Sequence, residues 1–216
     1  MNSIQKTARI AGLLYLALAI IGPFSLLYVP EALIVAGDAA ATTTNIKAAE
    51  GLFRLGIGGE VLIFLIEIVL SVLLYQLVKP VGKTLAMVAL ASRLAMAVVQ
   101  GVNVLNKLFV LLLLSGAGYL TALEPGQLQA LVATFLAGHA YGVYIWGAFF
   151  GLHLLALGYL VFRAGYLPGL LGVLLMIGAI IGELGLTLWL LIKGVNVEGW
   201  EKRVLDASRI EPAFSS

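Results

Sequence analysis

The chain has 216 residues, of which 62% are hydrophobic and 11% are charged, with a formal net charge of +2 and no cysteine. Soluble domains usually carry about 25% charged residues, so this composition favours a protein whose apolar surface faces lipid. The small net charge argues against nucleic acid as a partner, and the missing cysteine excludes disulfides, thiolate catalysis and cysteine-bound metals.

Five segments are long and apolar enough to cross a bilayer, which requires about 20 mainly apolar residues. They cover residues 8–29, 52–78, 83–115, 127–162 and 166–192. We therefore predict an all-α, polytopic transmembrane helix bundle with about five spanning helices, in one domain over residues 1–216. The first segment is too long for a signal peptide and is interpreted as a retained helix, kinked at Pro23. Residues 30–51 are expected to form an outer loop, and residues 193–216 a polar tail.

Basic residues beside the spans predict the orientation of the chain. They occur near the N-terminus, in the joint 79–83 and at Arg163, three places that share one side if the spans alternate. The positive-inside rule makes this side cytoplasmic, so we expect a membrane protein with a cytoplasmic N-terminus. The tail conflicts with this orientation, because five spans place it outside although it contains Lys193, Lys202, Arg203 and Arg209.

Polar side chains within the spans are the candidate binding residues, because ionisable groups in hydrocarbon are costly and usually functional. They are Glu60, Glu67, Arg93, Gln100, Asn103, His139, His153 and Glu183, and they identify no catalytic residue and no cofactor.

The second and third spans each carry a polar stripe. Counting from the turn between them places Glu67 and Arg93 at a similar depth, and Glu60 near Gln100 and Asn103. We predict an ion pair between Glu67 and Arg93, which can serve function or simply set the register of the two helices.

The histidines His139 and His153 lie 14 residues apart on the fourth span, on nearly the same face and about 21 Å from one another. This separation is too large for one metal ion, and we predict no metal site. It suits two stacked haems, although these need four histidines and the chain supplies two. Two hydrogen bonds between helices are the simpler interpretation.

Glu183 is expected at a depth close to Glu60 and His139. If the three side chains converge, they form a group that can relay protons or hold a cation. Alternatively, Glu183 pairs with another donor or marks the end of a helix.

Small-x3-small glycine patterns allow helices to approach closely, either within one chain or in a homo-oligomer. Three such patterns occur, at Gly138 and Gly142, Gly147 and Gly151, and Gly178 and Gly182.

Several strings along the chain are typical of one known family. They are Gly22–Pro30, Leu33–Ala41, Leu52–Gly56, Leu111–Gly116, Gly151–Leu155, Gly165–Pro168 and Leu190–Asn196. Together they resemble a bacterial multi-pass membrane protein family of unknown function, domain of unknown function 4386, over nearly the whole chain. The resemblance implies a helical domain in a bacterial inner membrane, with no agreed activity, and no catalytic residue carries over from it.

The resemblance also implies a further hydrophobic stretch between the equivalents of Leu170–Ile177 and Gly182–Ile192. In this chain the two are joined only by residues 178–182. This shortening changes a six-span plan into five, and it accounts for the unexpected side of the basic tail.

Three classes of function remain open, and in all of them the lipid bilayer is a partner. The first is a small transport or proton- or ion-coupled protein that uses Glu60, Glu67, Arg93 and Glu183. The second is a membrane redox or lipid-active enzyme in which His139 and His153 hold a cofactor such as haem. The third is a non-catalytic component that binds a partner protein. We favour the first, because charges within the membrane are its usual mark.

Overall fold

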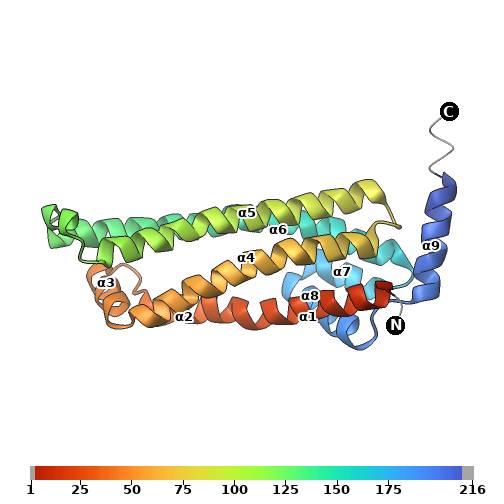
Figure 1. The fold of residues 1–216 in the computed structure, drawn as a ribbon, viewed down its shortest axis with the longest axis horizontal. Helices are drawn as coiled ribbons and strands as arrows, with labels where there is room; N and C mark the ends of the chain where they lie inside the picture. Colours follow the sequence, from red (N-terminus) through yellow and green to blue (C-terminus); the bar gives the residue numbers. More distant parts are fainter. Residues whose placement is uncertain (1–2, 211–216) are drawn as a thin grey trace. The chain divides into compact units, whose positions relative to one another are not determined.

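All regular secondary structure in residues 3–210, the part that the computed structural model describes, is helical (Figure 1). The elements are α1 (Ser3–Pro23), a π-helix (Phe24–Tyr28), α2 (Val29–Leu33), α3 (Ala39–Ala48), α4 (Glu50–Val78), α5 (Lys83–Leu114), a 3₁₀ helix (Gly118–Ala122), α6 (Pro125–Ala164), α7 (Gly169–Ile177), α8 (Ala179–Ile192) and α9 (Val197–Ile210).

Four helices in the described range are long and apolar enough to cross a membrane. They are the continuous stretch Ser3–Leu33, α4, α5 and α6, and the number rises to five if α8 and α9 together make one bent span. The predicted all-α fold with about five membrane-length helices is confirmed.

Contacts within the chain group it into two compact units. Unit 1 contains residues 1–19, 66–95 and 148–216, and unit 2 contains residues 20–65 and 96–147. The helices α1, α4, α5 and α6 each contribute one part to each unit.

Unit 2 begins with an irregular stretch of the first long helix. Pro23 ends α1, and the π-helix Phe24–Tyr28 follows directly. Proline cannot donate a backbone hydrogen bond, so a change of helical register beside Pro23 is the physical counterpart of the predicted kink. A π-helical turn is itself often found at functional sites.

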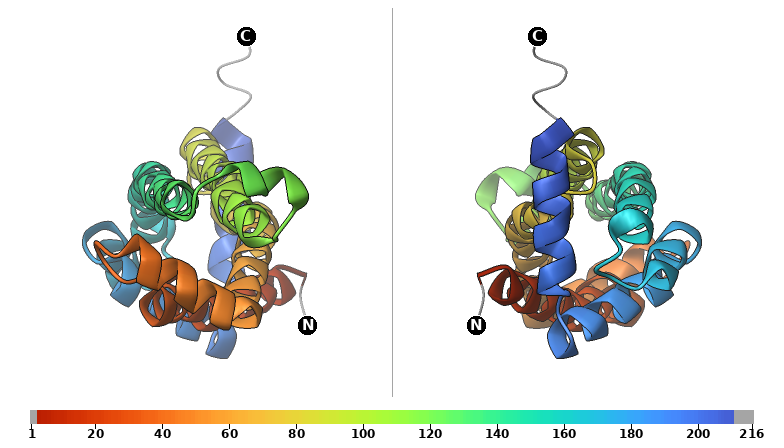
Figure 2. Two further views of the ribbon diagram at one scale, coloured as in Figure 1. Left: turned by 90° about the vertical axis from the view of Figure 1, so that its left-hand side faces the viewer. Right: turned by 90° about the vertical axis from the view of Figure 1, so that its right-hand side faces the viewer.

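The segment predicted as an outer loop, residues 30–51, is largely helical, because it contains α2 and α3. The carboxylate of Asp38 accepts a hydrogen bond from the backbone N–H of Ala41 at 2.8 Å and so caps the first turn of α3. Figure 2 (left) shows α3 and the 3₁₀ helix at the same end of unit 2. An apolar core joins α2, α3 and α4 and includes Val29, Ile46 and Phe53.

Unit 1 contains the main departure from the predicted spans. The stretch 166–192, predicted as one span, is two helices that meet at Gly178. A Cβ atom on Gly182 would lie 2.5 Å from the backbone nitrogen of Leu175, seven residues back in the chain. Such an approach requires the chain to reverse at Gly178, and the absence of a side chain on Gly182 allows the two backbones to touch. Neither α7 nor α8 is long enough to cross about 30 Å of hydrocarbon alone.

The predicted polar tail also has structure, because residues Val197–Ile210 form α9, which is bent by 106° from α8. Six of the 14 residues in α9 are charged, while Val197 and Trp200 pack against the core of unit 1. Figure 2 (right) shows α9 crossing the end of unit 1. A helix of this kind suits the surface of a membrane better than its interior.

Hydrogen bonds bring the N-terminus to the joint between α8 and α9. The side chain of Gln5 donates to the carbonyl of Lys193 at 2.8 Å and accepts from the backbone N–H of Val195 at 3.0 Å. The reversal at Gly178 therefore returns the chain to the end of unit 1 at which it began. The basic tail conflicted with the predicted orientation because residues 166–192 were counted as one crossing of the membrane.

Hydrogen bonds also connect the last turn of α4 to Tyr166 and to α9, at the same end of unit 1. The carbonyl of Leu77, in the last turn of α4, accepts hydrogen bonds from the Tyr166 hydroxyl at 2.6 Å and from the Trp200 indole at 3.1 Å. Carbonyls in a last helical turn have no partner within the helix, so these side chains satisfy one of them. Burial raises the pKa of the Tyr166 phenol, which therefore remains protonated and able to donate.

Candidate functional site

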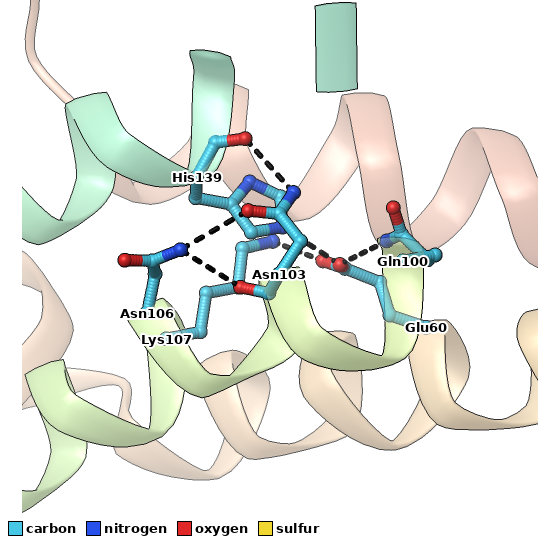
Figure 3. Close-up of polar contacts among 6 residues, drawn as sticks. All are labelled: Glu60, Gln100, Asn103, Asn106, Lys107 and His139. Carbon is cyan, nitrogen blue, oxygen red and sulfur yellow. Dashed lines mark hydrogen bonds and ion pairs between the residues drawn. The ribbon is translucent and has the colours of Figure 1, made fainter. Parts of the chain in front are cut away.

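The most buried polar group of unit 2 centres on Glu60 of α4. Figure 3 shows this Glu60 cluster, which consists of Glu60, Gln100, Asn103, Asn106, Lys107 and His139. One carboxylate oxygen of Glu60 pairs with the Lys107 ammonium. The other accepts hydrogen bonds from Gln100 Nε2 at 2.7 Å and from His139 Nε2 at 2.8 Å. Three side chains from α5 and α6 therefore converge on one carboxylate.

The cluster is closed to solvent. The side chain of Glu60 is 0% exposed and that of Lys107 is 3% exposed. Because Glu60 is an acceptor when ionised, His139 must carry its proton on Nε2, the nitrogen that faces the carboxylate. The opposite charges of Glu60 and Lys107 balance one another within the cluster.

Asn103 joins α5 to α6 beside Glu60, and Asn106 contacts Asn103 within α5. The amide of Asn103 donates to the backbone carbonyl of His139 at 2.9 Å. The amide of Asn106 donates to the backbone carbonyl and to the side-chain oxygen of Asn103, both at 3.1 Å. A Cβ atom on Gly142 would overlap the Asn103 side chain, so glycine at this position lets α6 pack directly against the amide.

The second buried group lies in unit 1 and centres on Arg93 of α5. This Arg93 cluster consists of Tyr15, Arg93, His153 and Glu183. Arg93 Nη1 lies 3.0 Å from His153 Nε2 and 3.5 Å from Glu183 Oε1. The guanidinium also stands over the ring of Tyr15, 5.1 Å from its centroid.

The hydrogen bonds determine the tautomer of His153. The guanidinium of Arg93 can only donate, so His153 Nε2 accepts. The other ring nitrogen, Nδ1, must then carry the proton and donates to the carbonyl of Ala89 at 2.9 Å. Both nitrogens of His153 are therefore engaged while the ring is neutral.

The predicted partners of the two glutamates are only partly those observed. Glu60 does contact Gln100, as the depth count predicted. Glu183 forms an ion pair with Arg93, and the buried Glu67 also attracts the charge of Arg93, so a direct ion pair between Glu67 and Arg93 stays a prediction. Counting residues from the turn of a hairpin predicts the depth of a residue along its helix. It does not predict which other helices contact the residue at that depth.

The predicted convergence of Glu60, His139 and Glu183 does not occur as a group. Glu60 and His139 meet in unit 2, whereas Glu183 binds Arg93 in unit 1. No group of three His, Asp or Glu side chains suited to a metal ion occurs among residues 3–210.

Three members of these clusters were absent from the predicted binding residues. Tyr15 lies within the first apolar segment. The sequence feature that could have identified it is a hydroxyl-bearing ring in the middle of a span. Asn106 follows Asn103 by three residues, a spacing that places both on one face of α5. Lys107 follows Asn103 by four residues, on the same face of α5, and it pairs with Glu60.

The geometry does not favour the haem alternative. A haem ligand must offer a free ring nitrogen to iron, and both nitrogens of His153 have polar partners. His139 uses Nε2 for Glu60. The two histidines also belong to different clusters.

The glycine patterns have different environments. Gly142 and Gly182 meet atoms of the same chain at close range, so they serve internal packing. A Cβ atom on Gly147 or Gly151 would meet no other atom of the described chain within 4 Å. A homo-oligomer formed through that pair remains a prediction.

Comparison with known proteins places the chain within a family. Residues 10–181 match the model of the family described as "Domain of unknown function (DUF4386)". An uncharacterized protein of the archaeon Archaeoglobus fulgidus is 29% identical over 122 residues, which are 56% of this chain and 59% of that protein. The match thus spans less than two thirds of that relative. No solved structure matches the chain.

Proposed function

The chain belongs to the DUF4386 family, whose function is unknown. We propose that it is an integral membrane protein in which protons or small cations move by binding at the Glu60 cluster. The four membrane-length helices support the membrane part of this proposal. The Glu60 cluster supports the coupling part.

The observation that carries the proposal is the Glu60 carboxylate, which is fully buried and is contacted by two ionisable partners, Lys107 and His139. Burying an ion pair costs desolvation energy, and apolar side chains of similar volume often pack at least as stably. Within a membrane, buried ionisable groups commonly mark proton or ion pathways.

His139 is the proposed proton acceptor. The charges of Glu60 and Lys107 balance, so a proton added to the imidazole gives the cluster one positive charge. The carboxylate of Glu60, 2.8 Å from His139 Nε2, stabilises the imidazolium. Alternatively, a small cation takes the place of the Lys107 ammonium at the Glu60 carboxylate.

The Arg93 cluster is less suited to this role. Adding a proton to His153 requires Nε2 to release the guanidinium of Arg93, 3.0 Å away, and places two positive groups together. We assign the Arg93 cluster to holding α1, α5, α6 and α8 together.

The orientation follows from the basic residues of unit 1. The N-terminus and the joint between α8 and α9 are held at one end by Gln5. The positive-inside rule places this end, with the N-terminus, in the cytoplasm.

Proton flux into proteoliposomes tests the proposal. The full chain is reconstituted with a pH-sensitive dye inside, and a potassium diffusion potential drives protons inward. We expect flux above that of protein-free liposomes, and a loss of about tenfold or more in Glu60→Gln, as for a general acid or base removed from its pathway. The matched control is Glu50→Gln, a carboxylate on the same helix that is 48% exposed and pairs with Arg54.

A double variant keeps the test valid if Glu60→Gln alone does not fold. Glu60→Gln with Lys107→Met removes both charges and leaves no unpaired ammonium. Flux equal to wild type in that variant would contradict the assignment of Glu60. Wild-type flux no greater than that of protein-free liposomes would contradict proton coupling, and the same vesicles loaded with sodium or potassium would test a cation.

A further inference from the structure

A pocket of about 490 Å³ lies in unit 1 between the α4–α5 turn and α9. Tyr75, Lys79 and Lys83 belong to its α4–α5 side, and Arg203 and Ser208 to its α9 side. The pocket is open to the surface of unit 1 and is separate from both buried clusters.

The lining favours an anion. Three of its residues, Lys79, Lys83 and Arg203, are positively charged, and one, Asp206, is negative. The N-terminal end of α5 also lines the pocket through Gly82 and Lys83, and the first turn of α5 contains no acidic residue. The positive end of the helix dipole makes such an end attractive to phosphate.

The helix α9 beside this pocket has features typical of a helix at the level of lipid headgroups. It is bent by 106° from α8, six of its 14 residues are charged, and Val197 and Trp200 pack against the core of unit 1. The indole of Trp200 donates to the carbonyl of Leu77. Tryptophan, basic residues and a crosswise amphipathic helix are together typical of the interface between membrane and water.

We propose that this pocket binds the phosphate of an anionic phospholipid, with Lys79 and Arg203 as its main contacts. Arg203 Nη2 donates to the carbonyl of Arg163 at 2.8 Å, which holds the guanidinium in place and leaves its other donors for the phosphate. The proposal rests on the membrane insertion proposed above but not on proton coupling at Glu60.

Lipid-dependent thermal stability of the full chain in detergent tests the site. The probes are phosphatidylglycerol, phosphatidylcholine as the neutral lipid, and glycerol 3-phosphate and inorganic phosphate as soluble sources of the same group. We expect phosphatidylglycerol alone to raise the melting temperature in a saturable way. In Lys79→Gln with Arg203→Gln, its apparent affinity should fall by about tenfold or more, the effect of two basic contacts at an anionic surface.

The matched control removes the same number of charges elsewhere in unit 1. Lys6→Gln with Arg9→Gln alters two exposed basic residues that do not line the pocket and should change the affinity by less than about twofold, as expected for screened surface charges. If Arg203→Gln disturbs folding, Lys79→Gln alone carries the test, because Lys79 is exposed.

Three results would overturn the proposal. Equal stabilisation by phosphatidylcholine would remove the anion preference. Equal stabilisation by glycerol 3-phosphate or inorganic phosphate would identify a soluble ligand instead. An equal loss in the two double variants would indicate general attraction to the surface. Resistance of the chain to extraction from membranes by alkaline carbonate separately tests insertion, so its failure is distinguishable from failure of the pocket.

Discussion

Replacing both members of the Glu60–Lys107 pair by methionine should cost less stability than replacing either one. Lys107→Met leaves the Glu60 carboxylate buried without the ammonium, with Gln100 and His139 as its remaining hydrogen-bond partners. Glu60→Met leaves a buried ammonium without its counter-ion. In both single variants a charge remains in a region from which water is excluded.

The magnitude follows from burial. The two side chains are 0% and 3% exposed, so the penalty for an unpaired buried charge applies in full. Breaking such a pair costs about 3–5 kcal/mol, whereas replacing the whole pair by apolar side chains is often neutral or stabilising. On helix α4 the pair Glu50–Arg54 is a matched control, because its side chains are 48% and 61% exposed and Arg54→Met should cost below about 1 kcal/mol.

The assay is unfolding of the purified chain in mixed micelles of increasing SDS content, followed by helical circular dichroism. The expected order of stability is wild type and the double variant together, then the two single variants well below. The reasoning would be refuted by additive losses in the double variant, or by single variants no less stable than Arg54→Met.

Two further predictions concern packing and orientation. Gly59→Ala should cost about 1–3 kcal/mol, because the added Cβ overlaps the Ser25 hydroxyl, whereas Gly58→Ala, which meets nothing within 4 Å, should not destabilise. Ser25→Ala should recover part of the loss, since it removes a buried hydroxyl with no hydrogen-bond partner in the described chain; a loss unchanged by Ser25→Ala would contradict this. Because the chain lacks cysteine, single cysteines at Ser3 and Ser208 should react with a membrane-impermeant maleimide from the same side of sealed vesicles, and reaction from opposite sides would exclude the proposed return of the chain at Gly178.

Composition and apolar run lengths were enough to predict an all-helical chain with membrane-length helices. The low share of charged residues and the lengths of α4, α5 and α6 express a local physical requirement, namely that backbone groups in hydrocarbon must be satisfied within each helix. For the same reason, the polar stripe of α5 could be read from its spacing, and the contact between Glu60 and Gln100 from the turn that joins their helices.

The tertiary structure alone decided which helices meet at each polar residue. His139 and His153 share a face of α6 by spacing, yet one binds Glu60 and the other Arg93. Glu183 reaches Arg93 rather than Glu60, because the reversal at Gly178 changes where α8 runs. Spacing defines depth and face along one helix, but partners across helices depend on packing between segments far apart in the sequence. A glycine such as Gly178 permits both a continuous helix and a reversal, and only contacts such as Gly182 against Leu175 select between them.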